Sequence, residues 1–309
     1  MSGSCGENSI ARLPWLVLSR KVCGVSAIPR KPLWLLPNLL SLDAPLVAVV
    51  WLYLFAKTWG VSYNPSHGYV VLALGVWVLY VADRLLDATL HGDSPRCQAR
   101  HQFHHKHWRM FVAGALIAAI GALATVLMKS PVAIFSYLIV EGILVAGFFA
   151  FATFTSSAVE DIPYAKNILA GAAFAFGTAL VAHVYLYDRG IRDLLLSREF
   201  QAFAVLCILN ISAIDLWEHA NRSPDPEVQA TDELSLTLPL TLLGAAAFFF
   251  AVQAGQHSSR PFFYAILTGA ALLLVLNRTR ARFSMEALRV LADLALVAPA
   301  LVFLSFPSS

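Results

Sequence analysis

The chain has 309 residues, of which 58% are hydrophobic and only 13% charged, and its mean hydropathy is +0.67. A water-soluble domain of this length cannot bury so much apolar surface, so the composition excludes a soluble globular protein and predicts a membrane protein. The formal net charge of +3 is too small and too dispersed to indicate a nucleic-acid partner.

Residues 1–32 are more polar than the rest and carry five basic side chains. Their apolar stretch, Leu13 to Leu18, is too short to cross a membrane or to act as a secretory signal. We therefore expect a basic cytoplasmic arm, followed by a single transmembrane domain over residues 33–309. The four cysteines are widely spaced, which favours neither a zinc site nor a disulfide framework.

Nine apolar runs of roughly 20 residues follow, each long enough to span a bilayer. They predict an all-α membrane protein, a bundle of about nine transmembrane helices that encloses a lateral cavity. Small residues such as Gly171 and Gly177 would let these helices approach closely. The runs lie at 36–57, 67–86, 110–128, 131–154, 164–186, 199–219, 234–255, 261–277 and 287–306.

The distribution of Lys and Arg predicts the orientation. The arm and the even-numbered loops hold 13 of these residues, and the odd-numbered loops hold 6. Cytoplasmic loops attract the excess, so the N-terminus is expected inside the cell and the C-terminus outside.

The span predicted at 67–86 ends in two carboxylates, Asp83 and Asp87. A spacing of four residues places them on one helix face, one turn apart, where two like charges repel each other. Close to hydrocarbon a carboxylate costs up to about 3 kcal/mol, so a counter-charge is needed. Either Arg84 and solvent supply it, as at an ordinary helix end, or a divalent cation does.

A second polar cluster closes the span predicted at 199–219, with Asn210, Asp215, Glu218 and His219. Asp215 and Glu218 are three residues apart and share a helix face. The predicted topology places both acidic pairs on the same side of the membrane, although they are far apart in the sequence. This arrangement favours a shared site for a hard cation with oxygen ligands, such as Mg²⁺.

The span predicted at 164–186 begins on that side with Tyr164, Lys166 and Asn167. A lysine there can bind an anion, assisted by the positive end of the helix, or it can snorkel to the lipid headgroups. Asn38 and Asp43 near the inner end of the first span have the same ambiguity. Acidic groups and cations beside apolar helices are what a magnesium-bound lipid diphosphate requires.

The nine-span layout, the two acidic motifs and the Pro-Tyr-Ala-Lys-Asn sequence at 163–167 together resemble the UbiA superfamily of intramembrane prenyltransferases. The resemblance covers most of the chain, from about residue 36 to residue 306. It implies Mg²⁺-dependent transfer of a prenyl group from an isoprenyl diphosphate to a hydrophobic acceptor, aromatic or lipid-like. Departure of diphosphate would leave a stabilised allylic cation. No protein partner is evident.

The resemblance also implies roles for individual residues. The expected metal ligands and catalytic residues are Asp83, Asp87, Asp215 and Glu218. For the diphosphate it implies Lys166 and its neighbours Tyr164 and Asn167, and location alone adds Arg84, Arg100 and Lys106. Secondary candidates are Asn38, Asp43, Asn210, His104, His105 and His219.

Two positions depart from the family pattern. The first motif usually begins with Asn four residues before its first Asp, where this chain has Leu79. The second motif usually has Asp four residues after its first Asp, where this chain has His219, with Glu218 one place early. These departures leave open a relative with altered chemistry, such as a membrane terpene cyclase, or a lipid-binding protein without catalysis.

The loop between the second and third spans is rich in histidine, with His101, His104, His105 and His107. Such a group matches one histidine box of membrane di-iron oxidases, but that fold needs several boxes and the other histidines are scattered. We expect instead a loop that caps the diphosphate site or lies solvated at the interface. A transporter is the other remote alternative. It would favour inverted repeats with broken helices near the midplane, whereas the acidic clusters here lie near span ends on the same predicted side.

Some polar residues fall inside the predicted spans. Glu141 and His183 have no obvious partner in their own helices, and intramembrane acids are candidates for contact with the acceptor or for proton transfer. Asp293 follows Arg289 by four residues, which indicates an ion pair within one helix.

Overall fold

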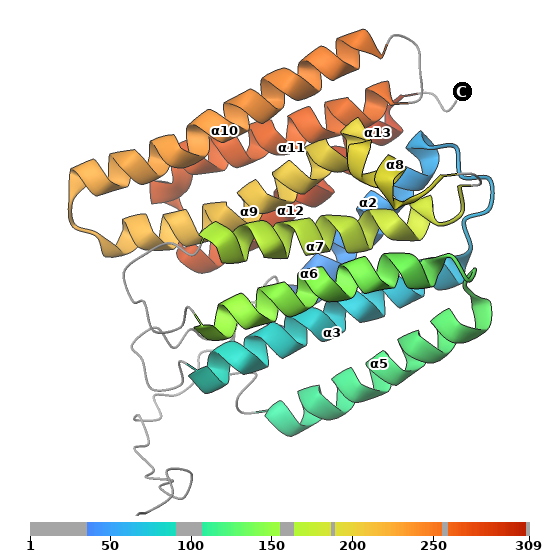
Figure 1. Ribbon diagram of the computed structural model, residues 1–309. Coiled ribbons are helices and arrows are strands. Elements are labelled where there is room, and N and C mark those ends of the chain that lie inside the picture. The colour runs from blue at the N-terminus through green and yellow to red at the C-terminus, as the bar shows by residue number, and fades with distance from the viewer. Residues whose placement is uncertain (1–35, 91–106, 155–163, 187–188, 255–258, 307–309) are drawn as a thin grey trace, which may run out of the picture. The chain divides into compact units, whose positions relative to one another are not determined.

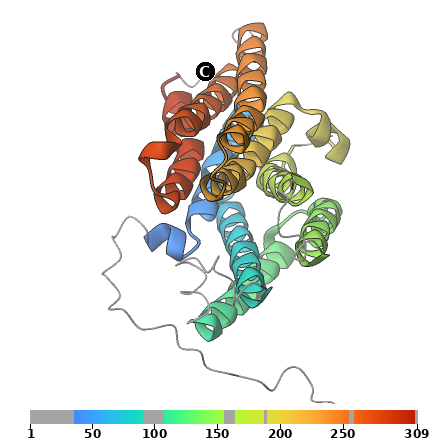
Figure 2. The same cartoon turned by 90° about the vertical axis from the view of Figure 1, so that its left-hand side faces the viewer.

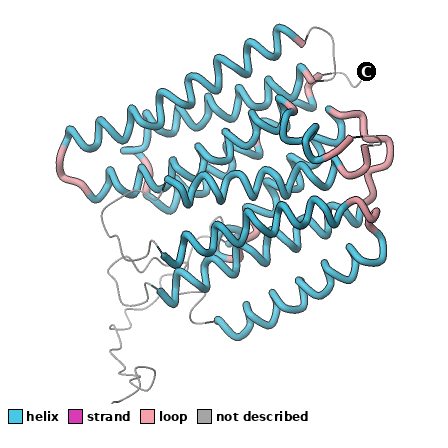
Figure 3. Tube along the Cα trace, viewed as in Figure 1, coloured by secondary structure: helices cyan, strands magenta, loops and turns pink. Residues whose placement is uncertain are grey.

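Helices account for the regular structure, and no strand occurs in the part of the chain that the structure describes (Figure 3). The computed structural model describes residues 36–90, 107–154, 164–186, 189–254 and 259–306, all of which lie in one unit, Leu35–Ser309. Lipid offers no hydrogen-bond partners, so apolar segments that cross it must satisfy their backbone groups internally, as a helix does.

The helices are labelled in Figure 1. In chain order they are α1 Leu36–Leu39, α2 Asp43–Thr58, α3 Ser66–Leu90, α5 Trp108–Lys129, α6 Ile134–Phe154, α7 Tyr164–His183, α8 Ile191–Leu196, α9 Arg198–Arg222, α10 Pro226–Gln253, α11 Arg260–Thr279, the 3₁₀ helix η3 Arg280–Arg282, α12 Met285–Val297 and α13 Pro299–Leu304.

Within the described residues, eight helical segments are long and apolar enough to span a membrane. They are α3, α5, α6, α7, α9, α10, α11 with η3, and α12 with α13. These segments confirm the eight runs predicted from residue 67 onward, and they make the chain a multi-pass integral membrane protein. The largest difference in a boundary is at α10, which begins at Pro226 and not at 234, because Asp225 caps its first turn by accepting a hydrogen bond from the backbone of Glu227.

The first predicted run, 36–57, is broken. Ser41 adopts a left-handed backbone conformation, φ 58°, between α1 and α2. Across this turn the Asn38 amide donates a hydrogen bond to the Asp43 carboxylate at 2.6 Å, so polar side chains stabilise the break. The 16 residues of α2 extend about 24 Å, less than the roughly 30 Å of a hydrocarbon core. The described part of the chain thus has eight spanning segments where nine were expected.

The short α2 helix is nevertheless at the centre of the bundle, where it packs against α3, α7 and α12. Trp51 and Phe55 of α2 are fully buried. The Trp51 ring stacks on Phe203 of α9 with 4.4 Å between centroids, and its indole nitrogen donates to the Leu296 carbonyl of α12 at 2.8 Å. A hydrogen-bonded indole buried among aromatic rings holds α2, α9 and α12 together.

Helices α5 and α6 lie at the edge of the bundle (Figure 2). The main partner of α5 is α3, and that of α6 is α7. Large apolar side chains on both helices are exposed, among them Ile117, Ile120 and Ile143, as lipid-facing helices require. By contrast, more than half of α7 and α9 is buried.

Successive spanning segments run in opposite directions through the bundle (Figure 1), so several helices have their polar ends on one side of it. The C-terminal ends of α3 and α9 lie at the same end as the beginnings of α7, α10 and α12, on the left in Figure 1. The two acidic motifs are therefore neighbours in space.

Candidate functional site

Asp83 and Asp87 lie one turn apart near the end of α3, and Lys166 of α7 lies between them. The Lys166 ammonium is 3.9 Å from an oxygen of each carboxylate. The side chains of Asp83 and Asp87 are 29% and 26% exposed, although the Asp83 oxygen that faces Lys166 is itself buried. One cation facing two carboxylates reduces the repulsion that the sequence spacing implies.

Lys166 also lies over the ring of Phe148 from α6, with 5.5 Å between the ammonium and the ring centroid. An aromatic face at this distance attracts a cation. The Lys166 side chain is only 23% exposed. Lys166 is therefore held by α3 and α6 together and does not snorkel freely.

The next residue of α7 reaches the second motif. The Asn167 amide donates a hydrogen bond to the Asp215 carboxylate of α9 at 2.9 Å. Asn167 is buried, 2% exposed, which makes the loss of its partner costly. Lys166 and Asn167 are consecutive, so one turn of α7 connects the acidic end of α3 with that of α9.

Other predicted residues form a separate group around α1 and α2. Arg84 is buried, donates to the Asn38 carbonyl, and lies 3.9 Å from the Asp43 carboxylate. Arg84 thus points away from the face that carries Asp83 and Asp87, although it is adjacent to them in the sequence. The structure does not bring Arg84, Asn38 or Asp43 into the Lys166 cluster.

The remaining residues of the second motif have partners from two further helices. Glu218 accepts a hydrogen bond from the guanidinium of Arg289 on α12. The His219 Nδ1 lies 2.7 Å from a carboxylate oxygen of Asp232 on α10.

Two more predicted residues lie nearby without direct contacts to the cluster in what the structure describes. Tyr164, half exposed at the start of α7, is within electrostatic reach of Asp232. Asn210 is buried in α9, and among the described residues its side-chain oxygen has no hydrogen-bond partner.

Sequence reasoning did not assign Asp232 and Phe148 to the site, and it paired Arg289 only within its own helix. Asp232 falls before the predicted start of its span at 234, because the polar first turns of α10 resemble a loop. Phe148 is one apolar residue among many in α6. No local pattern marks either residue, since both are defined by packing between helices.

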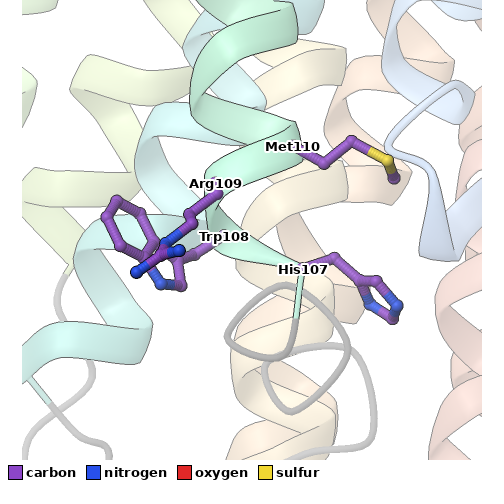
Figure 4. A pocket seen from close by; sticks show the side chains of 4 residues that line it. All are labelled: His107, Trp108, Arg109 and Met110. Atoms are coloured by element: carbon purple, nitrogen blue, oxygen red, sulfur yellow. The ribbon is translucent and has the colours of Figure 1, made fainter.

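An open pocket of about 400 Å³ lies at the start of α5, lined by His107, Trp108, Arg109 and Met110 (Figure 4). The Arg109 guanidinium is 5.7 Å from the centroid of the Trp108 ring, and the two side chains lie side by side in Figure 4. The other predicted residues of this loop, Arg100, His104, His105 and Lys106, lie outside the described residues.

No group of three or more His, Cys, Asp or Glu side chains that could hold a metal ion occurs in the described ranges. The expected set of four carboxylate ligands is therefore not assembled around one point there. Mg²⁺ does not require such a set, because it is usually bound through one or two carboxylates together with substrate phosphates and water.

Comparison with known proteins gives no match to a family model, to a curated protein or to a solved structure.

Proposed function

We propose that this chain is a magnesium-dependent intramembrane transferase, which moves a prenyl group from an isoprenyl diphosphate to a hydrophobic acceptor, aromatic or lipid-like. The observation that supports the proposal best is the pair Lys166 and Asn167, which contacts the acidic ends of α3 and α9 from one turn of α7. The charged groups lie at an end of the bundle beside apolar helices, which suits a substrate with an anionic head and a lipid chain.

The donor set at α3 fits Mg²⁺. Asp83 and Asp87 present carboxylates from successive turns of one helix face, and both are partly exposed. They would hold the ion together with oxygens of the substrate diphosphate. When bound, Mg²⁺ neutralises charge on the diphosphate and makes it a better leaving group.

Lys166 would bind the diphosphate. Its ammonium already lies beside the two carboxylates, so a phosphate oxygen that approaches them meets a cation. The N-terminal end of α7, a helix of 20 residues, favours the same negative charge through the helix dipole. Phe148 covers one side of Lys166 and would keep water from it.

Asn167 and Asp215 would position Lys166. Their hydrogen bond ties the first turn of α7 to α9, and Lys166 is part of that turn. A geometry that is fixed before the substrate binds lowers the entropy lost when the reacting groups align. Asp215 is thus proposed to act through Asn167.

The experiment uses the full chain purified in detergent, with isoprenyl diphosphates of several lengths, candidate acceptors and Mg²⁺. We expect diphosphate release that stops when EDTA removes the metal. Asp83→Asn and Lys166→Met should each lower the rate about a hundredfold, the usual effect of removing one electrostatic stabiliser.

Glu286→Gln is the matched control, because Glu286 is an exposed carboxylate in the first turn of α12. It should leave the rate unchanged. Release that does not depend on Mg²⁺, or wild-type rates in Asp83→Asn, would refute the proposal.

A second candidate is a relative that binds the lipid diphosphate without transferring its prenyl group. The contacts of Glu218 with Arg289 and of His219 with Asp232 favour it, because these residues of the second motif then bind other side chains of the protein instead of a metal ion. Saturable binding of an isoprenyl diphosphate with no release of diphosphate would select this candidate. Release without any acceptor, together with a cyclic isoprenoid product, would indicate a cyclase.

A further inference from the structure

The last turns of α9 make a polar contact with each of three other helices. One contact runs to α7, one to α12 and one to α10. In chain order they are Asp215 with Asn167, Glu218 with Arg289, and His219 with Asp232. The sequence predicts this segment as the second half of a metal site, so each contact bears on whether a cation can bind here.

Glu218 already has a cationic partner. The Arg289 side chain is 7% exposed, and it donates directly to the Glu218 carboxylate. If Glu218 turned to a metal ion, the buried guanidinium of Arg289 would lose the carboxylate to which it donates, which is unfavourable. Glu218 therefore stabilises Arg289 and is a poor ligand for a second cation.

His219 occupies the position where the resembled family has a carboxylate. Its Nδ1 is bonded to Asp232, whose side chain is 7% exposed. Imidazole is not a preferred ligand of Mg²⁺, which selects oxygen donors. One oxygen of the Asp232 carboxylate is bonded to the imidazole, so this position holds a histidine–carboxylate pair where the resembled family has a metal-binding carboxylate.

The acidic residues of this segment also point in different directions. Asp215 contacts a residue of α7, whereas Glu218 contacts one of α12. Their carboxylates therefore diverge from the α9 axis toward different helices. On α3, by contrast, Asp83 and Asp87 converge on a single cation, the ammonium of Lys166.

We infer that the end of α9 is a polar clamp between helices and not a second cation site, so that of the two acidic motifs only the one with Asp83 and Asp87 holds a divalent cation. The inference rests on the proposed function for the α3 site. It changes the expected metal stoichiometry, because two acidic motifs would then bind one ion.

The first test counts metal ions. Mn²⁺ is titrated into the full chain in detergent with inorganic diphosphate present, which supplies the oxygen ligands that the substrate would, and the Mn²⁺ bound to the chain is counted by electron paramagnetic resonance after gel filtration. We expect one Mn²⁺ per chain, lost in Asp83→Asn and in Asp87→Asn and retained in Asp215→Asn. Two ions in the wild type, no ion at all, or loss of the ion in Asp215→Asn would overturn the inference.

The second test addresses the clamp. Glu218→Gln and Arg289→Gln should each lower the melting temperature, by about 2 to 4 °C or more, because each leaves a partner unpaired. The double variant Glu218→Met with Arg289→Met removes both charges and should recover most of that loss while still binding one Mn²⁺. Single variants that melt as the wild type does would refute the clamp.

The outcomes separate this inference from the proposed function. A chain that binds one Mn²⁺ and melts as described, but neither binds nor releases a diphosphate, would refute the transferase and leave the clamp in place. A chain that releases diphosphate with two bound ions would support the transferase and refute the inference of a single cation site.

Discussion

Gly171 of α7 lies against Ile208 of α9 with no room for a side chain between them: a Cβ at Gly171 would lie 2.7 Å from the backbone nitrogen of Ile208. Asn167 is one turn before Gly171, and Asp215 is two turns after Ile208. The close contact of the two backbones thus brings the amide and the carboxylate within hydrogen-bond distance.

Gly171→Ala should therefore destabilise the protein and disturb the site. Overpacking of this kind costs about 1 to 3 kcal/mol. The melting temperature should fall, and so should the affinity for an isoprenyl diphosphate, because Lys166 moves with the first turns of α7. Gly142→Ala in α6 is the control, since a Cβ there meets nothing within 4 Å. Equal stability of the two variants would contradict this reading of the interface.

Lys166→Met should weaken binding of an isoprenyl diphosphate by about tenfold or more, equivalent to at least about 1.4 kcal/mol. The substitution removes the cation and leaves Asp83 and Asp87 facing each other. Isothermal titration calorimetry measures the effect. Lys129→Met, at an exposed position at the end of α5, is the control and should bind as the wild type does. Unchanged affinity in Lys166→Met would show that the ammonium does not meet the substrate.

The hydrogen bond between Asn167 and Asp215 should appear as coupling in a double-mutant cycle. With Asn167→Ala, Asp215→Ala and the double variant, we expect a coupling energy on the order of 1 kcal/mol in thermal or chemical unfolding. A cycle of Asn167→Ala with Glu286→Ala should be additive within about 0.5 kcal/mol. Additivity in the first cycle would mean that the bond contributes nothing to stability.

Arg84 should matter for stability and not for the substrate. Arg84→Met leaves Asp43 without its buried counter-charge, which typically costs about 3 to 5 kcal/mol. Affinity for an isoprenyl diphosphate should stay close to that of the wild type once folded protein is isolated. Arg282→Met, at an exposed position, provides the comparison for stability. A large loss of affinity with normal stability would instead place Arg84 in the diphosphate site.

The spanning helices could be predicted from the sequence because run length and apolar composition determine whether a helix can cross a bilayer. Eight runs became eight spanning segments. The remaining run, 36–57, failed at Ser41, where a left-handed residue and the bond between Asn38 and Asp43 end one helix and begin another. A window of mean hydropathy does not detect a single turn of this kind.

The site was only partly predictable. Helical spacing correctly places Asp83 and Asp87 on one face, but it says nothing about which neighbouring helix that face meets. Arg84 and Arg289 show the limit: both have acidic residues close in sequence, yet Arg84 turns to α2, and Arg289 binds Glu218 of α9. The ion-pair partner of each arginine depends on how the helices pack against one another. The spacing of residues within one helix does not determine that packing.

Lys166 and Asn167 are adjacent, and adjacent residues of a helix point about 100° apart. This angle lets one turn of α7 face α3 and α9 at once. A one-residue insertion between Lys166 and Gly171 would rotate the first turn of α7 relative to the tight contact at Ile208. Natural relatives of this chain should therefore show no length change within this stretch of α7.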